Sequence, residues 1–160
     1  DAEGEGFYDP EAAKDVMAGI LENPRVLAGM RVVEVQEQAV PAFSDAYRFQ
    51  TDRAPILARR TRDDGSRQYL THEDEAADAV LTRTLRHKMR TAGLNADPAD
   101  ATVRFDRSYD GAHTKLVTIK GVHHKGSVCP VLVEGPPAAV RFSWCVGVGA
   151  LTGSGFGALQ

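Results

Sequence analysis

Five glycines fall within the eleven residues 147–157, which read GVGALTGSGFG. Glycine lacks a Cβ and adopts positive φ without strain, so such a segment suits sharp turns and close approach to another backbone. It lacks the lysine of a Walker phosphate loop, and Thr152 stands where a dinucleotide fingerprint needs its third glycine. Two interpretations stay open: a structural turn around a buried Phe156, or a loop that approaches a phosphate.

The composition favours a globular protein with a core, because 42% of the 160 residues are hydrophobic and 26% are charged. No apolar run approaches the length of a membrane span, and no secretory signal opens the sequence. The net charge of −3 excludes a protein coated in positive charge but permits a local basic face. Cys129 and Cys145 lack metal-ligand spacing, so we expect buried thiols in a reducing, cytoplasmic setting.

The apolar periodicity predicts two helices. The first begins at Asp9-Pro10-Glu11, with Asp9 as N-cap, and ends at Asn23-Pro24; the second runs from about Glu73 to Thr91. Residues 137–146 fit either a strand or a helix. The alternating patterns predict strands at 30–40, 46–51, 55–59, 68–71, 102–109, 114–119 and 127–133. Asp110-Gly111 predicts a hairpin between 102–109 and 114–119. This order indicates an α+β fold with helices on antiparallel sheet.

The second predicted helix carries a row of positive side chains at helical spacing, namely Arg83, Arg86, His87 and Arg90. Acidic residues at its start and basic residues at its end also suit the helix dipole. The row is therefore interpreted either as a dipole-compensated surface or as a phosphate-binding face.

The segment 115–126 contains three lysines, two histidines and no acidic residue: Lys115, Lys120, His123, His124 and Lys125. Glycines flank the His-His-Lys stretch, which is expected to form a turn with accessible backbone N–H groups. A solvated hairpin tip and a phosphate-contacting loop are both consistent with this pattern.

No strong catalytic signature is present in the sequence. Adjacent histidines on a strand point to opposite faces, so His113, His123 and His124 are not expected to share a metal. A serine triad would need a nucleophile elbow, and neither cysteine has a histidine at a recognisable spacing. No catalytic residue and no cofactor is assigned.

The sequence resembles the later two thirds of the CRISPR-associated repeat-RNA-processing endoribonucleases, in the repeat-associated RNA-binding superfamily. The glycine-rich signature Gly147-Val-Gly149…Ser154-Gly155-Phe156-Gly157 is the most specific part of the match. The other matching segments are Phe7-Tyr8-Asp9-Pro10-Glu11, Asn23-Pro24, Arg31-Val-Val-Glu-Val, Phe49-Gln-Thr-x-x-x-Pro55-Ile56 and Lys115-Leu-Val-Thr-Ile-Lys120-Gly121.

The resemblance implies tandem ferredoxin-like (βαββαβ) halves. Residues 1–41 would be the last helix and strand of the first half, and residues 46–160 the complete second, RNA-binding half. Residues 137–146 would then be a helix, and the glycine-rich loop would join it to the final strand near bound RNA. The RNA-contacting set implied in that loop is Gly149, Thr152, Ser154, Gly155 and Gly157.

Members of this family cut repeat RNA without a metal, through attack of a 2′-hydroxyl on the neighbouring phosphate. A histidine of the first half is the usual base, so the resemblance places it before Asp1 or leaves it out. The family's glycine loop often carries basic residues, whereas this sequence has Ala150-Leu151-Thr152, so phosphate contact there would rest on backbone amides and on the Thr152 and Ser154 hydroxyls.

The expected partners are CRISPR repeat RNA and, as further candidates, other CRISPR-associated proteins, with no membrane contact. Two other hypotheses remain open. One is a non-catalytic RNA-binding subunit of a CRISPR ribonucleoprotein. The other is a ferredoxin-like module that binds a small ligand or the edge of a partner's sheet.

Overall fold

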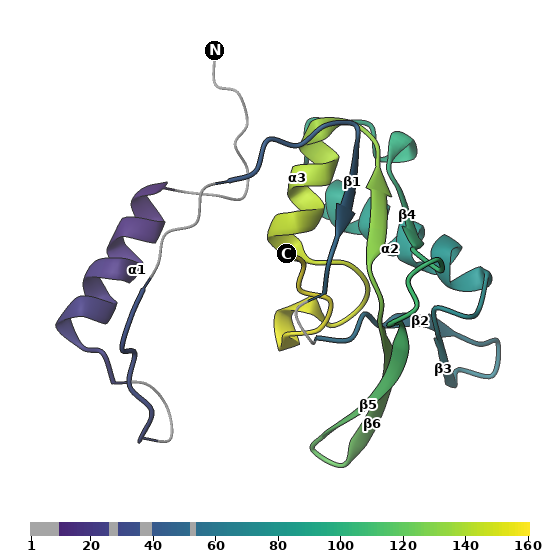
Figure 1. Ribbon diagram of the computed structural model, residues 1–160, viewed down its shortest axis with the longest axis horizontal. Helices are drawn as coiled ribbons and strands as arrows, with labels where there is room; N and C mark the ends of the chain where they lie inside the picture. Colours follow the sequence, from purple (N-terminus) through teal and green to yellow (C-terminus); the bar gives the residue numbers. More distant parts are fainter. Residues whose placement is uncertain (1–9, 26–28, 36–39, 52–53) are drawn as a thin grey trace. The chain divides into compact units, whose positions relative to one another are not determined.

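The computed structural model describes residues 10–25, 29–35, 40–51 and 54–160 (Figure 1). The chain divides into two compact units, Asp1–Ala42 and Phe43–Gln160. Among the described residues, no helix is long and apolar enough to cross a membrane.

The first unit contains α1 (Pro10–Glu22), which confirms the predicted helix; its N-cap prediction, Asp9, lies outside the described residues. The helix ends where predicted, and the Asn23 backbone N–H still bonds the Gly19 carbonyl at 3.0 Å. The predicted strand at 30–40 is wrong over residues 30–35, which form only one bridge, Arg25↔Arg31; residues 36–39 lie outside the described part. Alternation marks a face suited to burial, but a strand also needs a partner for its hydrogen bonds.

Apolar side chains remain exposed in this unit, including Val16, Leu21 and Met30. Val33 is 93% exposed, although the alternating pattern of residues 30–40 predicts a strand there. A small hollow of about 170 Å³ is lined by Met17, Ile20, Leu21, Val32, Val33, Glu34 and Val35. The first unit therefore lacks a buried core of its own among its described residues.

The second unit is built on a three-stranded antiparallel sheet in the order β1 (Ala46–Phe49), β7 (Val131–Glu134), β4 (Thr102–Phe105). The register aligns Phe49, Val131 and Phe105 across the sheet, and all three are buried. The next row, Arg48, Leu132 and Arg104, points to the other face and is not buried. One face of the sheet therefore forms the core.

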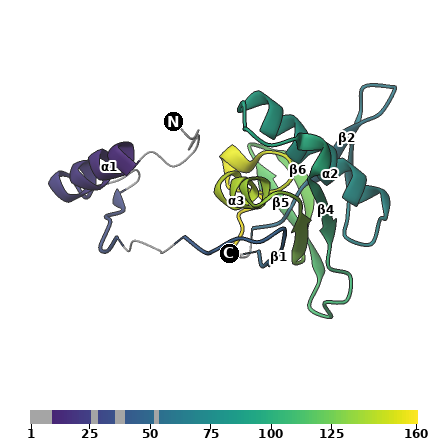
Figure 2. The ribbon, with the colours of Figure 1, turned by 90° about the horizontal axis from the view of Figure 1, so that it is seen from above.

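Helices α2 (Ala76–Thr91) and α3 (Pro137–Val146) cover that face (Figure 2). The helix implied for residues 137–146 is confirmed, with Pro137 in its first turn, where a missing N–H costs nothing. The chain then returns to β1, where Gln50 and Gln160 exchange two backbone hydrogen bonds of 3.0 Å around the bridge Thr51↔Leu159. The final strand is thus reduced to a bridge, and the order is that of an α+β ferredoxin-like fold.

Two hairpins extend this framework: β2 (Ala58–Thr61) with β3 (Arg67–Leu70), and β5 (His113–Ile119) with β6 (Val122–Val128) (Figure 1). Short 3-10 turns lie at Pro98–Asp100 (η2) and Thr152–Ser154 (η3).

The predicted pairing of 102–109 with 114–119 is wrong, because β4 pairs with β7 and β5 pairs with β6. The β5–β6 turn is Lys120-Gly121, whose φ values of 48° and 77° are those of a tight two-residue hairpin turn. The His123-His124-Lys125 stretch therefore lies within β6 rather than in a turn.

Cys129 is buried, and its burial raises the pKa of the thiol to about 11. Cys145 is exposed on α3, so the prediction of two buried thiols is wrong for Cys145.

Candidate nucleic-acid interface

The glycine-rich segment lies against the backbone of Pro55–Leu57. Ala150 N–H donates to the Leu57 carbonyl at 2.9 Å, and Gly157 N–H donates to the Pro55 carbonyl at 3.1 Å. A Cβ on Gly149 would lie 2.7 Å from the Leu57 oxygen, which is closer than packing allows. Gly147, Gly149 and Gly157 are the glycines of the segment at which a Cβ would meet neighbouring backbone, so these three allow the close contact.

Only part of the predicted loop contact set is accessible. Gly149 and Gly157 are buried, whereas Gly153, Ser154 and Gly155 are exposed at the tip of the segment. Thr152 is half-buried. The structure thus gives Gly149 and Gly157 a packing role, and it leaves Ser154 and Gly155 at the surface.

Three segments meet at His124, which is only 7% exposed. Its Nδ1 lies 2.9 Å from the Tyr69 hydroxyl on β3. The ring centroids of His124 and Phe156 are 5.6 Å apart, and Phe156 is buried, as the interpretation of the segment as a structural turn expects. His124 therefore joins the β5–β6 hairpin to the glycine-rich segment, and its own ring is a packing group.

The β5–β6 hairpin divides the predicted residues between two faces. In the register Lys115 lies opposite Gly126 and Val117 opposite His124, so Lys115 and His124 share one face. Lys125 lies opposite Leu116, and His123 opposite Thr118, on the other face. His123 and Lys125 are exposed there, and Lys120 is exposed at the turn. Lys115 is exposed on the His124 face, so the exposed basic residues among the predicted set of this hairpin are Lys115, Lys120, His123 and Lys125.

The arginine row of α2 is also divided. Arg83 and Arg90 are exposed, as is His87. The Arg86 guanidinium instead donates to the Ala101 carbonyl at 2.8 Å and to the Ala99 carbonyl at 2.6 Å, so it fixes η2 against α2. Arg83 and Arg90 stay predicted phosphate contacts, and Arg86 has a structural task.

Lys88 was not predicted as a site residue, yet it contacts the glycine-rich segment from α2. Its Nζ donates to the Gly147 carbonyl and to Thr152 Oγ1, each at 3.0 Å. Burial lowers the pKa of Lys88 from 10.5 to about 8. The sequence signal was present, because Lys88 falls within the buried stripe of α2 between Leu85 and Met89.

The lowered pKa of Lys88 predicts a pH dependence that Lys88→Met removes. Between pH 8 and 10.5 the folded lysine is largely neutral while the unfolded lysine is still protonated. The unfolded state then binds more protons, so the free energy of unfolding rises with pH across this window. Urea titrations of the wild type and of Lys88→Met should show a difference that grows in favour of the wild type from pH 8 to pH 10. A pH-independent difference would contradict this assignment.

Four of the five histidines have a contact through Nδ1: His72 with Ser127 Oγ, His113 with the Gly111 carbonyl, His123 with Thr118 Oγ1 and His124 with the Tyr69 hydroxyl. Across the described ranges, no group of three or more His, Cys, Asp or Glu side chains is arranged to hold a metal ion.

The fold and the C-terminal glycine-rich segment define this protein as a ferredoxin-like α+β domain. The family model "CRISPR associated protein Cas6, C-terminal" matches residues 37–160. The chain therefore belongs to the Cas6 family of CRISPR-associated proteins, which confirms the resemblance seen in the sequence.

Solved structures agree with the fold. A structure described as a Cas6-related gene product from Pyrococcus furiosus has a TM-score of 0.77 at 18% identity, covering 95% of this chain and 63% of that one. A RAMP protein described as binding different RNA substrates has a TM-score of 0.75 at 17% identity, covering 96% and 65%. A CRISPR associated protein Cas6 has a TM-score of 0.73 at 19% identity, covering 95% and 64%.

This chain thus spans 63 to 65% of the length of these solved chains. A search of curated proteins finds no match.

Proposed function

We propose that this chain is the RNA-binding, C-terminal part of an endoribonuclease that processes precursor CRISPR RNA in the cytoplasm, without a metal. The observation that carries the proposal is the set of exposed basic residues on the β5–β6 hairpin, which His124 joins to the glycine-rich segment: Lys115, Lys120, His123 and Lys125. Membership of the Cas6 family supports repeat RNA as the ligand.

The domain assignment belongs to the same proposal. Residues 1–41 would be the last helix and strand of a preceding ferredoxin-like half, and residues 46–160 the second half. The exposed Val16, Leu21 and Val33 support this, because an incomplete half leaves its core face uncovered.

Catalysis by the described residues is not expected. A general base must reach the 2′-hydroxyl and be oriented for proton transfer. His124 is buried, and His123, the exposed histidine next to it in β6, contacts Thr118 Oγ1 through Nδ1 at 2.8 Å. These contacts favour binding, so a non-catalytic RNA-binding subunit of a CRISPR ribonucleoprotein stays the second candidate.

Incubation of the 160-residue chain with end-labelled CRISPR repeat RNA from its own host, in EDTA, separates chemistry from binding. On a denaturing gel we expect intact RNA, while a native gel shows a complex. One discrete cut that His123→Ala abolishes would assign the cleavage to this chain and contradict the expectation.

A further inference from the structure

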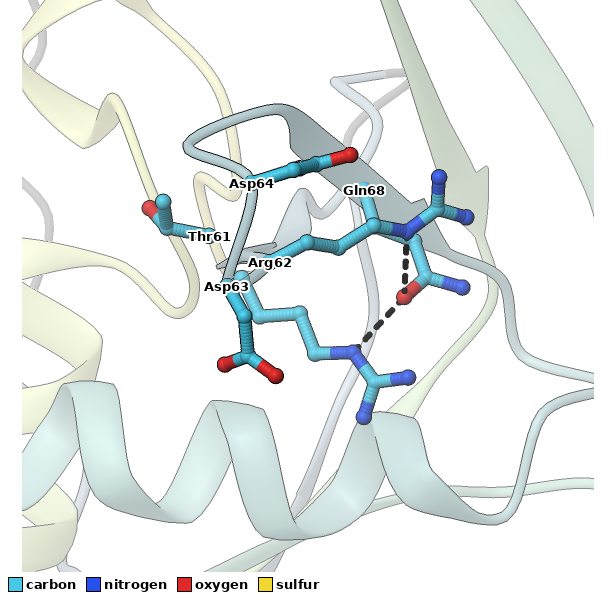
Figure 3. Close-up of a pocket in the computed structure, with 6 residues that line it drawn as sticks. Thr61, Arg62, Asp63, Asp64 and Gln68 are labelled. Carbon is cyan, nitrogen blue, oxygen red and sulfur yellow. Dashed lines mark hydrogen bonds between the residues drawn. The ribbon is translucent and has the colours of Figure 1, made fainter.

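The β2–β3 hairpin carries a net positive charge that is not part of the RNA-binding site proposed above. Residues 58–70 contain four arginines and two aspartates, an excess of two positive charges. Residues Arg60, Thr61, Arg62, Asp63, Asp64 and Gln68 line a surface hollow of about 560 Å³ (Figure 3).

One amide oxygen orders two of these arginines. Gln68 Oε1 accepts a hydrogen bond from Arg60 Nε at 2.8 Å and a longer one from Arg62 Nε at 3.4 Å (Figure 3). Guanidinium groups bound through Nε keep both terminal nitrogens available as donors. Within the described part of the chain, neither arginine forms an ion pair with a carboxylate, and both are exposed. We call this set the arginine fork: Arg60, Arg62 and Gln68.

The hairpin that carries the arginine fork contacts the β5–β6 hairpin, because β3 packs beside β6. The Asp74 carboxyl has a lowered pKa, chiefly because the Thr71 backbone N–H donates to it at 2.7 Å. Positive charge on Lys125 and on Arg60 lowers it further. Tyr69, next to Gln68 in β3, also contacts His124 in β6. Arg60 and Lys125 thus belong to one surface formed by two hairpins.

The charges of the hollow decide where an anion would lie. Asp64 accepts from the Ser66 backbone N–H at 2.8 Å, and Asp63 is its neighbour, so the turn of the hairpin is acidic. The Gln68 end carries the two guanidinium groups. Pre-ordered guanidinium donors match the oxygens of a phosphodiester and contact it without reading the base.

We propose that the arginine fork is a phosphodiester-binding site that extends the path of an RNA strand from Lys125 onto the β2–β3 hairpin. The inference rests on the proposed RNA-binding function. It assigns Arg60 and Arg62 as backbone contacts and Gln68 as the positioning residue that orders them.

The test compares two arginines of the same hairpin. Arg62→Gln removes a charge from the fork, whereas Arg67→Gln removes a charge from the exposed residue that pairs with Thr61, on the other face. The probe is fluorescein-labelled CRISPR repeat RNA, and the readout is Kd by anisotropy across a salt series. Equal melting temperatures check that both variants fold.

Loss of one phosphate contact on single-stranded RNA should lower the slope of log K against log salt by about 0.7. We expect Arg62→Gln to weaken binding about threefold to tenfold with that change of slope, and Arg60→Gln/Arg62→Gln to lower the slope by about 1.4. Gln68→Leu should raise Kd while the slope stays unchanged, because both charges remain.

Arg62→Gln and Arg67→Gln with equal Kd and equal slope would overturn the fork while leaving the RNA-binding function intact. Absence of RNA binding by the wild type would overturn the proposed function, and the fork with it. The two failures are therefore distinguishable.

Discussion

Gly157→Ala is expected to destabilise the domain by on the order of 3–5 kcal/mol. Gly157 has a φ of +62°, and a Cβ there would overlap the carbonyl oxygen of Val148. The backbone of Val148 is itself held against Gly157, since the Val148 N–H donates to the Gly157 carbonyl at 3.0 Å. The clash cannot be relieved by a side-chain rotation, so the segment must leave Pro55–Leu57. Equilibrium urea unfolding measures the loss.

Gly153→Ala is the matched control within the same segment. Nothing lies within 4 Å of a Cβ at Gly153, and its φ is not in the left-handed region. Its free energy of unfolding should stay within about 1 kcal/mol of the wild type. Equal effects of the two substitutions would mean that Gly157 does not pack as described.

Lys120→Glu/Lys125→Glu is expected to weaken repeat-RNA binding on the order of 100-fold at low salt. Both lysines are exposed on the hairpin, so reversal replaces attraction for phosphate by repulsion with little effect on folding. The salt slope should fall by about 1.4, because two phosphate contacts are lost. Anisotropy titrations at several salt concentrations measure both quantities.

Arg104→Glu is compared with the single variant Lys125→Glu as a control for net charge, since each of these two variants reverses one exposed charge. Arg104 lies on the sheet face opposite the helices, where it pairs with Glu134 at 3.4 Å. Binding should stay near that of the wild type. Equal losses from Arg104→Glu and Lys125→Glu would show that net charge, and no hairpin contact, controls affinity.

Local signals predicted the elements whose ends are chemically marked. Asn23-Pro24 ends α1 and Pro137 begins α3, because proline fixes φ and removes a donor. Asp110-Gly111 is also a local signal, but the hairpin that it predicts between 102–109 and 114–119 is wrong. The Asp106 carboxylate bonds Arg48 Nε at 2.7 Å and the Ser108 N–H at 3.1 Å, which shapes residues 106–112 into a separate turn. The strand that pairs with β4 is β7, which lies far along the chain, so no residue next to β4 in the sequence indicates this pairing.

The clustering of charge predicts where the candidate site lies in the sequence. It does not predict which of the basic residues are exposed and which are buried. Composition located the lysines and histidines of 115–126, but burial of His124 depends on Tyr69 and Phe156 from other segments. The sequence does not identify Lys88 or the arginine fork as site residues, because their partners are set by tertiary contacts or by cross-strand register: Gly147, Thr152 and Gln68. A basic residue in a buried stripe is the sequence signal that would have singled out Lys88.

The salt dependence of repeat-RNA binding tests the central claim most directly. The 160-residue chain is titrated with labelled CRISPR repeat RNA, without divalent metal, from about 50 to 200 mM salt. Contacts from Lys120, Lys125, Arg60 and Arg62 predict a slope of log K against log salt of about −3 or steeper. Absence of binding, or an affinity that does not change with salt, would contradict the assignment of this chain as an RNA-binding domain.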